Sequence, residues 1–335
     1  MSGVITRPRT PMTDALRGIQ APVQQRLDLV TDAMQEIVSS GVPMVEQVSR
    51  HLLGMRGKMF RPTLTLLASD LERKAEPRAV RLAAVIELMH LATLVHDDSV
   101  DHSATRRGLP TVNSMFSHQV SVIMGDFLYS RALRALVAIR DFDVLRVVTD
   151  VSSELSMGEM RQLAAIDGLS FGEPEYELMV RAKTASLISA ACESGALCGA
   201  ARFREQMARY GDRLGMAFQV VDDILDYTED EAVTGKPSGS DLREHKVTLP
   251  LIAALPSFSP AARQQVERLF AADEPTDAAI QEVVGIVAEA GGLDYARRRG
   301  EQYAQEAEDA LHGVPESPAR AALVEAIAYV TDRRW

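Results

Sequence analysis

The sequence predicts an all-α protein, a large single-domain helical bundle, on three observations. Apolar residues recur at helical spacing almost everywhere, and the alternating pattern of a β-strand is hard to find. Small residues crowd the segment 182–200, which lets neighbouring helices approach closely at the centre of a bundle. The chain has 335 residues, of which 46% are hydrophobic, and this is ample for one large buried core.

Gly, Pro, Ser and Asp residues divide the chain into successive helices. Residues 1–13 mix Arg7, Arg9 and two prolines without apolar periodicity, so we expect a disordered N-terminal arm before a helical domain at 14–335. The longest interruption lies between Tyr227 and Thr248, where a loop can close over a ligand. The helices expected in this domain span residues 14–38, 43–53, 60–71, 77–101, 114–139, 143–167, 174–197, 201–228, 248–255, 259–270, 275–290, 293–311 and 317–331.

Charge and cysteine content exclude several classes of protein. The formal net charge of -11 argues against nucleic acid as a partner. Cys192 and Cys198 lie six residues apart on one expected helix, so their side chains diverge, and we expect reduced thiols in a cytoplasmic protein. No run of eighteen apolar residues appears and the first residues lack the apolar centre of a secretory signal, so we expect no integral membrane segment.

Two aspartate clusters repeat one spacing, and each ends an apolar helical run. Asp97-Asp98-x-x-Asp101 and Asp222-Asp223-x-x-Asp226 lie 125 residues apart. On a helix the first and last aspartates of each cluster share a face, where like charges repel unless a cation lies between them. Carboxylate oxygens select Mg²⁺, and Mg²⁺ is usually completed by substrate phosphate. A single cluster is equally well explained as a solvated helix end, but two copies favour a diphosphate bridged by metal between them.

Basic residues near the clusters supply what a phosphate site needs. Each is ambiguous alone, because Lys and Arg are normally solvated surface residues. The candidates are Lys58 and Arg61 upstream, Arg106 and Arg107 after the first cluster, Lys183 at the start of the small-residue helix, and Lys236 and Lys246 in the loop after the second cluster.

The motifs in this order resemble the trans-polyprenyl diphosphate synthases. The first group comprises Leu94 to Asp101 (LVHDDSVD), Arg106 to Thr111 (RRGLPT) and Gly125 to Leu128 (GDFL). The second group comprises Gly158 to Gln162 (GEMRQ), Lys183 to Ala185 (KTA), Phe218 to Asp226 (FQVVDDILD) and Gly235 to Pro237 (GKP). The resemblance runs from about Gly57 to Arg333, and the sequence departs from the usual pattern at Arg56, Met59 and His245.

The resemblance implies a helical bundle around a deep central cavity, a homodimer, and a reaction that adds isopentenyl diphosphate to an allylic diphosphate. It implies Mg²⁺ as the cofactor, three ions bound with the allylic diphosphate, and peripheral membrane contact for product release. Asp97, Asp101 and Asp222 match the direct metal ligands. The auxiliary ligands or their supporting partners match Asp98, Asp223 and Asp226.

The resemblance also assigns the basic and polar residues to two substrates. Arg106, Lys183, Gln219 and Lys236 are similar to residues that hold the allylic diphosphate. Thr184 and Lys246 are also assigned to substrate binding, and Lys246 and Asp241 fall on the closing loop. Residues that match those holding isopentenyl diphosphate are Lys58, Arg61, His90 and Arg107, joined by Arg333. The catalytic set implied is Asp97, Asp101, Arg106, Lys183, Asp222 and Lys236.

Product length is expected to depend on the helix that leads into Asp97. Ala92 and Thr93 lie one turn before the aspartates and Met89 one turn deeper, so no large aromatic side chain blocks the first turn. This resembles long-chain members with products of roughly thirty to fifty carbons, with Met124 or Phe127 as deeper stops. The alternative is that Ala92 and Thr93 only pack against a neighbouring helix, which leaves a short-chain farnesyl or geranylgeranyl diphosphate synthase open.

Three further functions compete with this hypothesis. Glu87-x-x-His90 has the spacing used by di-iron bundles, but such bundles need a second copy, and the sequence has none. A class I terpene cyclase shares the first aspartate motif but usually carries an Asn/Ser/Glu motif in place of the second. A non-catalytic subunit of a heteromeric synthase is the non-enzyme alternative, although such subunits tend to lose aspartates that this chain retains.

Overall fold

The all-α prediction is confirmed. The computed structural model describes residues 14–55, 57–72, 77–106, 108–164, 168–228 and 238–332. Within these ranges nearly all regular structure is helical, and the strands are two short segments that pair as one hairpin. The predicted arm at 1–13 lies outside the described residues and stays a prediction.

The N-terminal helices are α1 (Asp14–Gln20), α2 (Gln24–Val38), α3 (Pro43–Gly54) and α4 (Phe60–Ser69). The prediction of one helix over 14–38 was wrong, because a 3₁₀ turn, η1 (Ala21–Val23), separates α1 from α2. Pro22 explains the break, since proline has no N–H to continue the α-helical hydrogen-bond ladder. Met59, one of the departures from the family pattern, precedes α4 with a left-handed φ of 53°.

The middle of the chain begins with α5 (Pro77–Val100), which carries the first aspartate cluster at its C-terminal end. A hairpin of β1 (Thr105–Arg106) and β2 (Leu109–Pro110) follows, then α6 (Val112–Met115), α7 (His118–Val137) and α8 (Phe142–Ala164). The helix expected at 114–139 is therefore two helices. Ser117 interrupts it, because its side chain accepts a hydrogen bond from the Val120 amide and starts α7 anew.

The segment predicted to be the bundle centre is buried as expected. It follows α9 (Glu173–Val180) and covers most of a π-helical turn, η3 (Arg181–Ala185), and all of α10 (Ser186–Gly199). A 3₁₀ turn, η4 (Ala201–Phe203), then leads to α11 (Arg204–Thr228). Close helix contacts require its glycines: a Cβ at Gly195 would lie 2.3 Å from the Thr65 carbonyl oxygen, and one at Gly215 would lie 2.5 Å from the Ala185 Cα. Neither backbone can yield cheaply, so small residues hold α10 against α4 and α11.

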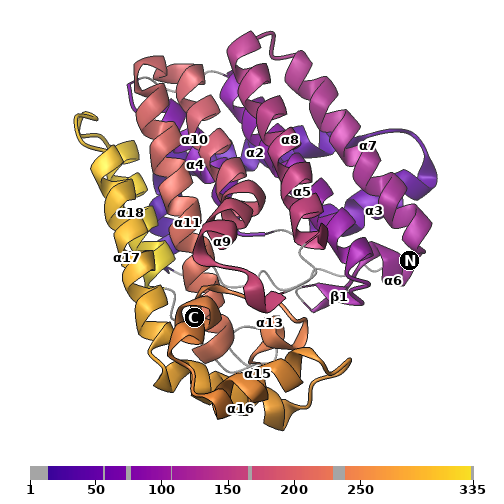
Figure 1. Ribbon diagram of the computed structural model, residues 1–335. Coiled ribbons are helices and arrows are strands. Elements are labelled where there is room, and N and C mark those ends of the chain that lie inside the picture. The colour runs from indigo at the N-terminus through magenta and orange to yellow at the C-terminus, as the bar shows by residue number, and fades with distance from the viewer. Residues whose placement is uncertain are drawn as a thin grey trace.

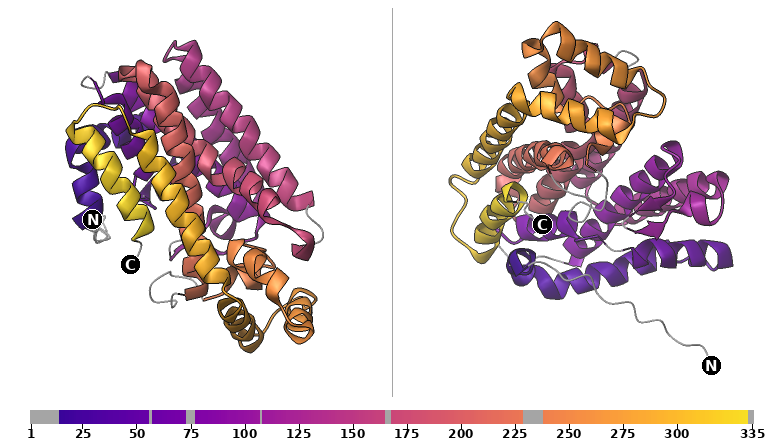
Figure 2. Two further views of the ribbon diagram at one scale, coloured as in Figure 1. Left: turned by 60° about the vertical axis from the view of Figure 1, so that its left-hand side comes forward. Right: turned by 90° about the horizontal axis from the view of Figure 1, so that it is seen from below.

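The C-terminal part closes one end and one flank of the bundle. Its elements are α13 (Ser240–Arg243), α14 (Leu249–Ala254), η5 (Leu255–Ser257), α15 (Pro260–Phe270), α16 (Asp277–Glu289), α17 (Gly292–Ala310) and α18 (Pro318–Thr331). Figure 1 shows α17 and α18 along the side of α11, with α13, α15 and α16 gathered at the lower end. Seen from below, α1 and α2 lie along one edge and α15 and α16 along the opposite edge (Figure 2).

Helix α5 is the one helix in the described part of the chain that is long and apolar enough to cross a membrane. The sequence analysis did not anticipate this, because no uninterrupted apolar run marks it. More than half of the apolar window is buried inside the fold, where α5 packs against α7, α2, α4 and α10. Its apolar character is therefore that of a core helix.

Candidate active site

The two aspartate clusters both end long helices of the bundle. Asp97, Asp98 and Asp101 lie at the C-terminal end of α5, and Asp222, Asp223 and Asp226 lie in the last two turns of α11. A helix C-terminus carries a partial negative charge, so carboxylates placed there are electrostatically unfavourable. Two such clusters therefore indicate a site at which a ligand or a metal ion supplies positive charge.

Asp97 is a carboxyl of the first cluster with a raised pKa. Burial raises its pKa to about 6, and the neighbouring charges of Glu159 and Asp101 act in the same direction against those of Lys183 and Arg106. Asp101, at the other end of the motif, is exposed, and its amide donates to the Asp97 carbonyl over 2.8 Å. The helix therefore continues through the motif and places Asp97 and Asp101 on one face, as predicted.

Asp98 differs from its neighbours, because its side chain is buried. The Arg106 Nε donates to the Asp98 Oδ1 over 2.7 Å. The Arg106 side chain is 32% exposed and the Asp98 side chain is 7% exposed. Arg106 comes from strand β1, so this ion pair ties the hairpin to the end of α5. The pair also places the Arg106 guanidinium close enough to Asp97 to act on its pKa.

The π-helical turn η3 brings the next cation to the site. Lys183 Nζ lies 2.7 Å from Glu159 Oε1 and donates to Gln162 Oε1 over 2.5 Å. Lys183 therefore contacts two residues of the GEMRQ motif on α8. Thr184 donates to Gln219 Oε1 on α11 over 2.9 Å. A π-turn widens a helix locally and is frequent at functional sites, and here it carries two adjacent side chains towards different helices.

The middle aspartate of the second cluster is buried like that of the first. Asp223 is 2% exposed, and its two oxygens accept from the Tyr176 hydroxyl over 2.5 Å and from the Gln219 Nε2 over 2.8 Å. Burial holds the pKa of Asp223 well above its usual range, and Asp241 and Asp222 add to the effect. Asp222, in contrast, is exposed.

Asp226 holds the segment that follows α11. Its carboxylate oxygens accept from the backbone amides of Ser240 and Asp241 over 3.1 and 3.0 Å, and its carbonyl accepts from the Gly239 amide over 2.7 Å. These bonds fix the start of α13 against the aspartate motif. Asp241 is thereby placed among the carboxylates of the second cluster, where it raises the pKa of Asp223.

Lys246 links the two clusters. Burial disfavours its charged form, but a hydrogen bond to Glu244 and the charges of Glu244, Asp241 and Asp101 outweigh burial and raise the pKa of Lys246. One lysine thus lies within the electrostatic range of an aspartate from α5 and of one beside α11. The chain therefore brings the ends of α5 and α11 together, although 125 residues separate the two motifs.

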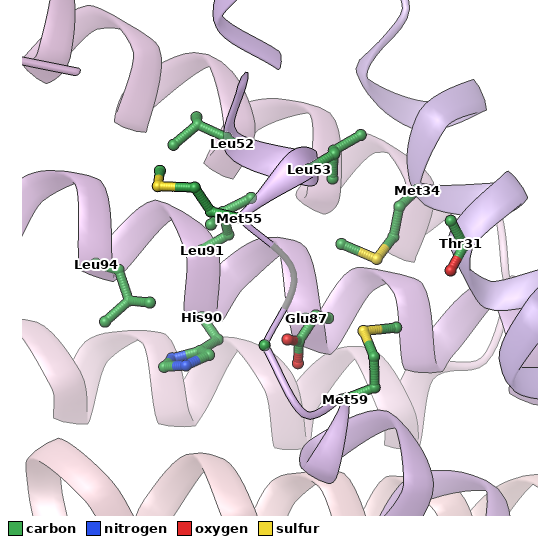
Figure 3. Close-up of a pocket in the computed structure, with 11 residues that line it drawn as sticks. Thr31, Met34, Leu52, Leu53, Met55, Met59, Glu87, His90, Leu91 and Leu94 are labelled. Atoms are coloured by element: carbon green, nitrogen blue, oxygen red, sulfur yellow. The ribbon is translucent and has the colours of Figure 1, made fainter. Parts of the chain in front are cut away.

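Of the residues predicted to hold isopentenyl diphosphate, His90 lies on the α2 and α3 side of α5. A small cavity of about 40 Å³ there is lined by Gly57 and His90 together with Thr31, Met34, Leu52, Leu53, Met55, Met59, Glu87, Leu91 and Leu94. Figure 3 shows Glu87 and His90 pointing from α5 to the same side, among methionine and leucine side chains. Lys58, next to this cavity in the chain, is exposed, with its Nζ 5.8 Å from the Tyr329 ring centroid.

Three predicted site residues, Arg107, Lys236 and Arg333, lie outside the described residues, so their placement stays a prediction. The chain-length candidates Met89 and Ala92 are 2% and 1% exposed, and Thr93 donates to the His90 carbonyl over 2.8 Å. Their role in setting product length also stays a prediction.

Some functional contacts escaped the sequence analysis. Tyr176 was not a candidate, because nothing in the sequence of α9 relates it to Asp223, which lies 47 residues away. Glu159 was noted only as part of a motif, yet its charge acts on Asp97 and its carboxylate pairs with Lys183. The signal was present in the GEMRQ motif, but its partner could not be read from spacing.

Carboxylates of the two clusters fit a divalent metal that is completed by a ligand. No three His, Cys, Asp or Glu side chains among the described residues lie close enough to hold a metal ion by themselves. Mg²⁺ is commonly bound by one or two carboxylates plus substrate phosphates, so this arrangement suits Mg²⁺ with a diphosphate. It does not suit a di-iron centre, and the Glu87-x-x-His90 motif instead borders the small apolar cavity.

Comparison with known proteins decides the family. Residues 42–287 match the family described as polyprenyl synthetase. The chain belongs to this family. It is therefore a trans-prenyltransferase of the polyprenyl diphosphate synthase class, whose substrates are isopentenyl diphosphate and an allylic diphosphate.

Individual relatives cover nearly the whole chain. It is 38% identical over 322 residues to an all-trans-nonaprenyl-diphosphate synthase (geranyl-diphosphate specific) of Rhodobacter capsulatus, covering 96% of this chain and 98% of the relative. It is 34% identical to the octaprenyl diphosphate synthase of Escherichia coli, covering 91% and 94%.

Two solved structures share the fold. A polyprenyl synthase from Caulobacter crescentus, complexed with calcium and isoprenyl diphosphate, superimposes with a TM-score of 0.90 at 32% identity and covers 98% of this chain and all of its own. A decaprenyl diphosphate synthase from Rhodobacter capsulatus also has a TM-score of 0.90, at 34% identity, covering 95% and 99%. The first of these contains a divalent metal together with a diphosphate.

Proposed function

We propose that this protein is a Mg²⁺-dependent, long-chain all-trans polyprenyl diphosphate synthase. The observation that carries the proposal is the junction of the two aspartate motifs, with Lys246 within electrostatic range of both Asp101 and Asp241. The similarity to nonaprenyl, octaprenyl and decaprenyl synthases favours a long-chain product. Geranylgeranyl synthases share the fold as well, with a TM-score of 0.87 for one from Pyrococcus horikoshii, so product length needs its own test.

Metal binding falls to the first aspartate of each cluster and to Asp101. Asp97, Asp101 and Asp222 are the proposed direct ligands, and three Mg²⁺ ions bound with the allylic diphosphate satisfy the chemistry of the family. Asp98, Asp223 and Asp226 already hold Arg106, Tyr176 with Gln219, and the start of α13. We assign these three a supporting role that fixes the ligands and the loop in place. When bound, Mg²⁺ supplies positive charge that stabilises the leaving diphosphate.

The cationic side chains act on the same leaving group. When the allylic C–O bond breaks, the electron pair leaves with the diphosphate, and Arg106, Lys183, Lys236 and Lys246 stabilise that negative charge. Arginine stays charged and binds phosphate oxygens in bidentate fashion, which suits Arg106 to this role. Gln219 and Thr184 hold each other between α11 and η3 and keep Lys183 oriented.

The second substrate is held by the other basic set. Lys58, Arg61, His90, Arg107 and Arg333 bind the diphosphate of isopentenyl diphosphate, whose double bond attacks the allylic carbon. Proton loss from the new carbon chain then regenerates an allylic product, and the departed diphosphate takes that proton. Apolar side chains around the growing chain exclude water, which would otherwise quench the cation.

A homodimer in the cytoplasm completes the proposal. Helix α7 leaves apolar side chains exposed near its N-terminal end, with Val122 and Ile123 at 38% and 66% of their surface, and a second copy of this chain fits that end of the helix. The two cysteines are buried and free, which suits a reducing compartment. Sedimentation analysis of the wild type against Ile123→Glu tests the dimer: a monomeric variant supports this face, and an unchanged dimer refutes it.

The reaction is tested with the purified chain alone. It is incubated with Mg²⁺, isopentenyl diphosphate and each of several allylic starters, and the products are separated by chain length. We expect long-chain polyprenyl products, and a product of fifteen or twenty carbons would refute the long-chain assignment. No consumption of isopentenyl diphosphate would refute the proposed enzyme.

A matched pair of variants connects the activity to the aspartates. Asp222→Asn should lower kcat by about 100-fold or more, because one charged contact to the leaving group is lost. Asp150→Asn, which removes the same charge from the exposed face of α8, should leave kcat unchanged. Equal activity of both variants would contradict the assignment of the second cluster.

A further inference from the structure

A second pocket lies between the C-terminal end of α2, the first part of α5 and the last turns of α7. It holds about 230 Å³ and is lined by Arg81, Arg131 and Arg134, with Glu36, Ile37, Ala135 and Ala138. At about 30 Å³ for each water molecule, it has room for several waters or for one phosphate group. The unusual feature is the convergence of three arginines on one pocket in a protein of net charge -11.

Arg131 is held rigidly at the wall of this pocket. Its guanidinium donates to the backbone carbonyls of Ile37 and Ser39, which close the end of α2. It also lies 5.7 Å from the ring centroid of Phe127. A guanidinium fixed in this way contributes its charge to the pocket without further ordering when an anion binds.

The other two arginines have donors to spare. Arg81 has a buried Nε without a hydrogen-bond partner in the described part of the chain, and its Nη1 lies 3.6 Å from Glu36 Oε1. Glu36 is 72% exposed, so it holds Arg81 only loosely. Arg134 is exposed and makes no side-chain hydrogen bond or ion pair with any described residue. Three cations therefore face one weakly held carboxylate.

The pocket is separate from the reaction centre. Arg81 and Asp97 lie sixteen positions apart on the same helix, which corresponds to about 24 Å along the axis of α5. The allylic diphosphate, if held at the aspartates, cannot reach these arginines. The chain that leaves the pocket at Ser39 carries Val42, the N-cap of α3, and Met44, in the first turn of α3, which are 52% and 53% exposed. Apolar side chains beside a cationic pocket are typical of a surface that meets lipid headgroups.

We infer that the pocket of Arg81, Arg131 and Arg134 binds a phosphate group, at a site distinct from that of the substrates. The ligand is either the phosphate of an anionic lipid headgroup or a free phosphate or diphosphate from solution. Three guanidinium groups supply charge-assisted donors to such a group and lose their mutual repulsion when it binds. Binding at this pocket does not require the proposed reaction, and it can succeed or fail independently of it.

The experiment uses the full chain and a double variant, Arg81→Gln with Arg134→Gln, which leaves the structural Arg131 in place. A second variant, Arg263→Gln with Arg268→Gln, removes the same charge from the exposed face of α15 and serves as the control. One arm measures co-sedimentation with phosphatidylcholine vesicles, with and without phosphatidylglycerol. The other arm measures calorimetric binding of inorganic pyrophosphate in EDTA.

Each arm identifies one source of the phosphate. Each arginine near a charged lipid surface contributes about fivefold in affinity, so the pocket variant should bind phosphatidylglycerol vesicles about 25-fold more weakly than the control. If the pocket variant instead loses pyrophosphate binding while no variant binds vesicles, the ligand is a free phosphate. If the pocket variant and the control agree in both arms, the inferred site is wrong.

Prenyl transfer provides the check on folding. Both variants should keep wild-type turnover, because none of the four arginines lies at the aspartate clusters. Wild-type turnover with lost phosphate binding therefore separates this site from the proposed function. If circular dichroism shows that the pocket variant is unstable, the single variant Arg134→Gln, at an exposed position, replaces it. This variant should bind phosphatidylglycerol vesicles about fivefold more weakly than the wild type.

Discussion

Replacement of Tyr176 by Phe should weaken both the fold and the site through one buried carboxyl. The Tyr176 hydroxyl donates to Asp223 Oδ2 over 2.5 Å, and Asp223 is 2% exposed, so no water can replace the lost bond. Leaving a buried acceptor unsatisfied costs about 1–3 kcal/mol. With an unfolding entropy of about 2.1 cal/mol/K per residue, 335 residues give about 0.7 kcal/mol/K, so Tm should fall by about 1.5–4 °C.

The same variant should show a pH-dependent loss. Burial holds the pKa of Asp223 above its usual range, and the Tyr176 hydrogen bond opposes that shift because it favours the ionised carboxylate. Without the hydroxyl the pKa of Asp223 rises further. Because a raised pKa penalises the folded state only where the carboxyl would otherwise be ionised, the variant should lose more stability at high pH than at low pH.

The assays are thermal unfolding at two pH values and Mg²⁺-dependent prenyl transfer. Tyr210→Phe is the matched control, because Tyr210 is also fully buried but donates to the Leu323 carbonyl, away from the aspartates. Both variants should lose stability, whereas only Tyr176→Phe should need more Mg²⁺ for half-maximal rate. If Tyr176→Phe retained the wild-type Tm and Mg²⁺ requirement, the support that Tyr176 gives to Asp223 would be refuted.

Three other changes probe the first cluster and the tunnel. The pKa of Asp97 is raised to about 6, so below that pH protons compete with metal and the Mg²⁺ requirement should rise by up to about tenfold per pH unit; a flat pH profile of Mg²⁺ titrations would contradict this. Gly125→Ala places a Cβ 2.2 Å from His96 Nε2, so the His96 ring must turn away from the Val122 carbonyl and Asp126, beside Asp97; we expect about 1 kcal/mol lower stability and reduced kcat, and wild-type values in both would exclude the clash. Ala92→Phe should shorten the product without abolishing turnover, and an unchanged product distribution on chromatography would place the tunnel floor elsewhere.

Apolar periodicity and helix-breaking residues predicted most helices of the fold. The errors of this prediction have local causes. The break at Pro22 follows from a missing N–H, and that at Ser117 from a side-chain cap, and both signals were present in the sequence but were outweighed by the apolar periodicity around them. The π-turn at Lys183 is different. No sequence rule predicts the extra residue in that turn, because it depends on how η3 packs against α8 and α11.

The site was predictable in composition but not in its internal contacts. Helical spacing identified which aspartates share a face, since that is local geometry. Contacts such as Tyr176 with Asp223 join different helices, and only the packing of the bundle sets them. The left-handed φ of 55° at His245, where the family often has glycine, likewise emerged only from the structure, where its ring lies 5.8 Å from that of Phe270.

The two aspartate motifs solve one geometric problem in the same way. Adjacent residues on a helix point about 100° apart, so a motif whose first and last aspartates face the opening must turn its second aspartate towards the protein. In both motifs the second aspartate is buried and has partners: Asp98 accepts a hydrogen bond from Arg106, and Asp223 accepts hydrogen bonds from Tyr176 and Gln219. Because Arg106 and Tyr176 belong to elements other than the helix that they hold, the inward aspartate anchors the helix end while Asp97 and Asp222 remain available to a metal. The adjacent pair of aspartates therefore combines a ligand with its own support, and the repetition in the sequence reflects two helix ends built to the same requirement.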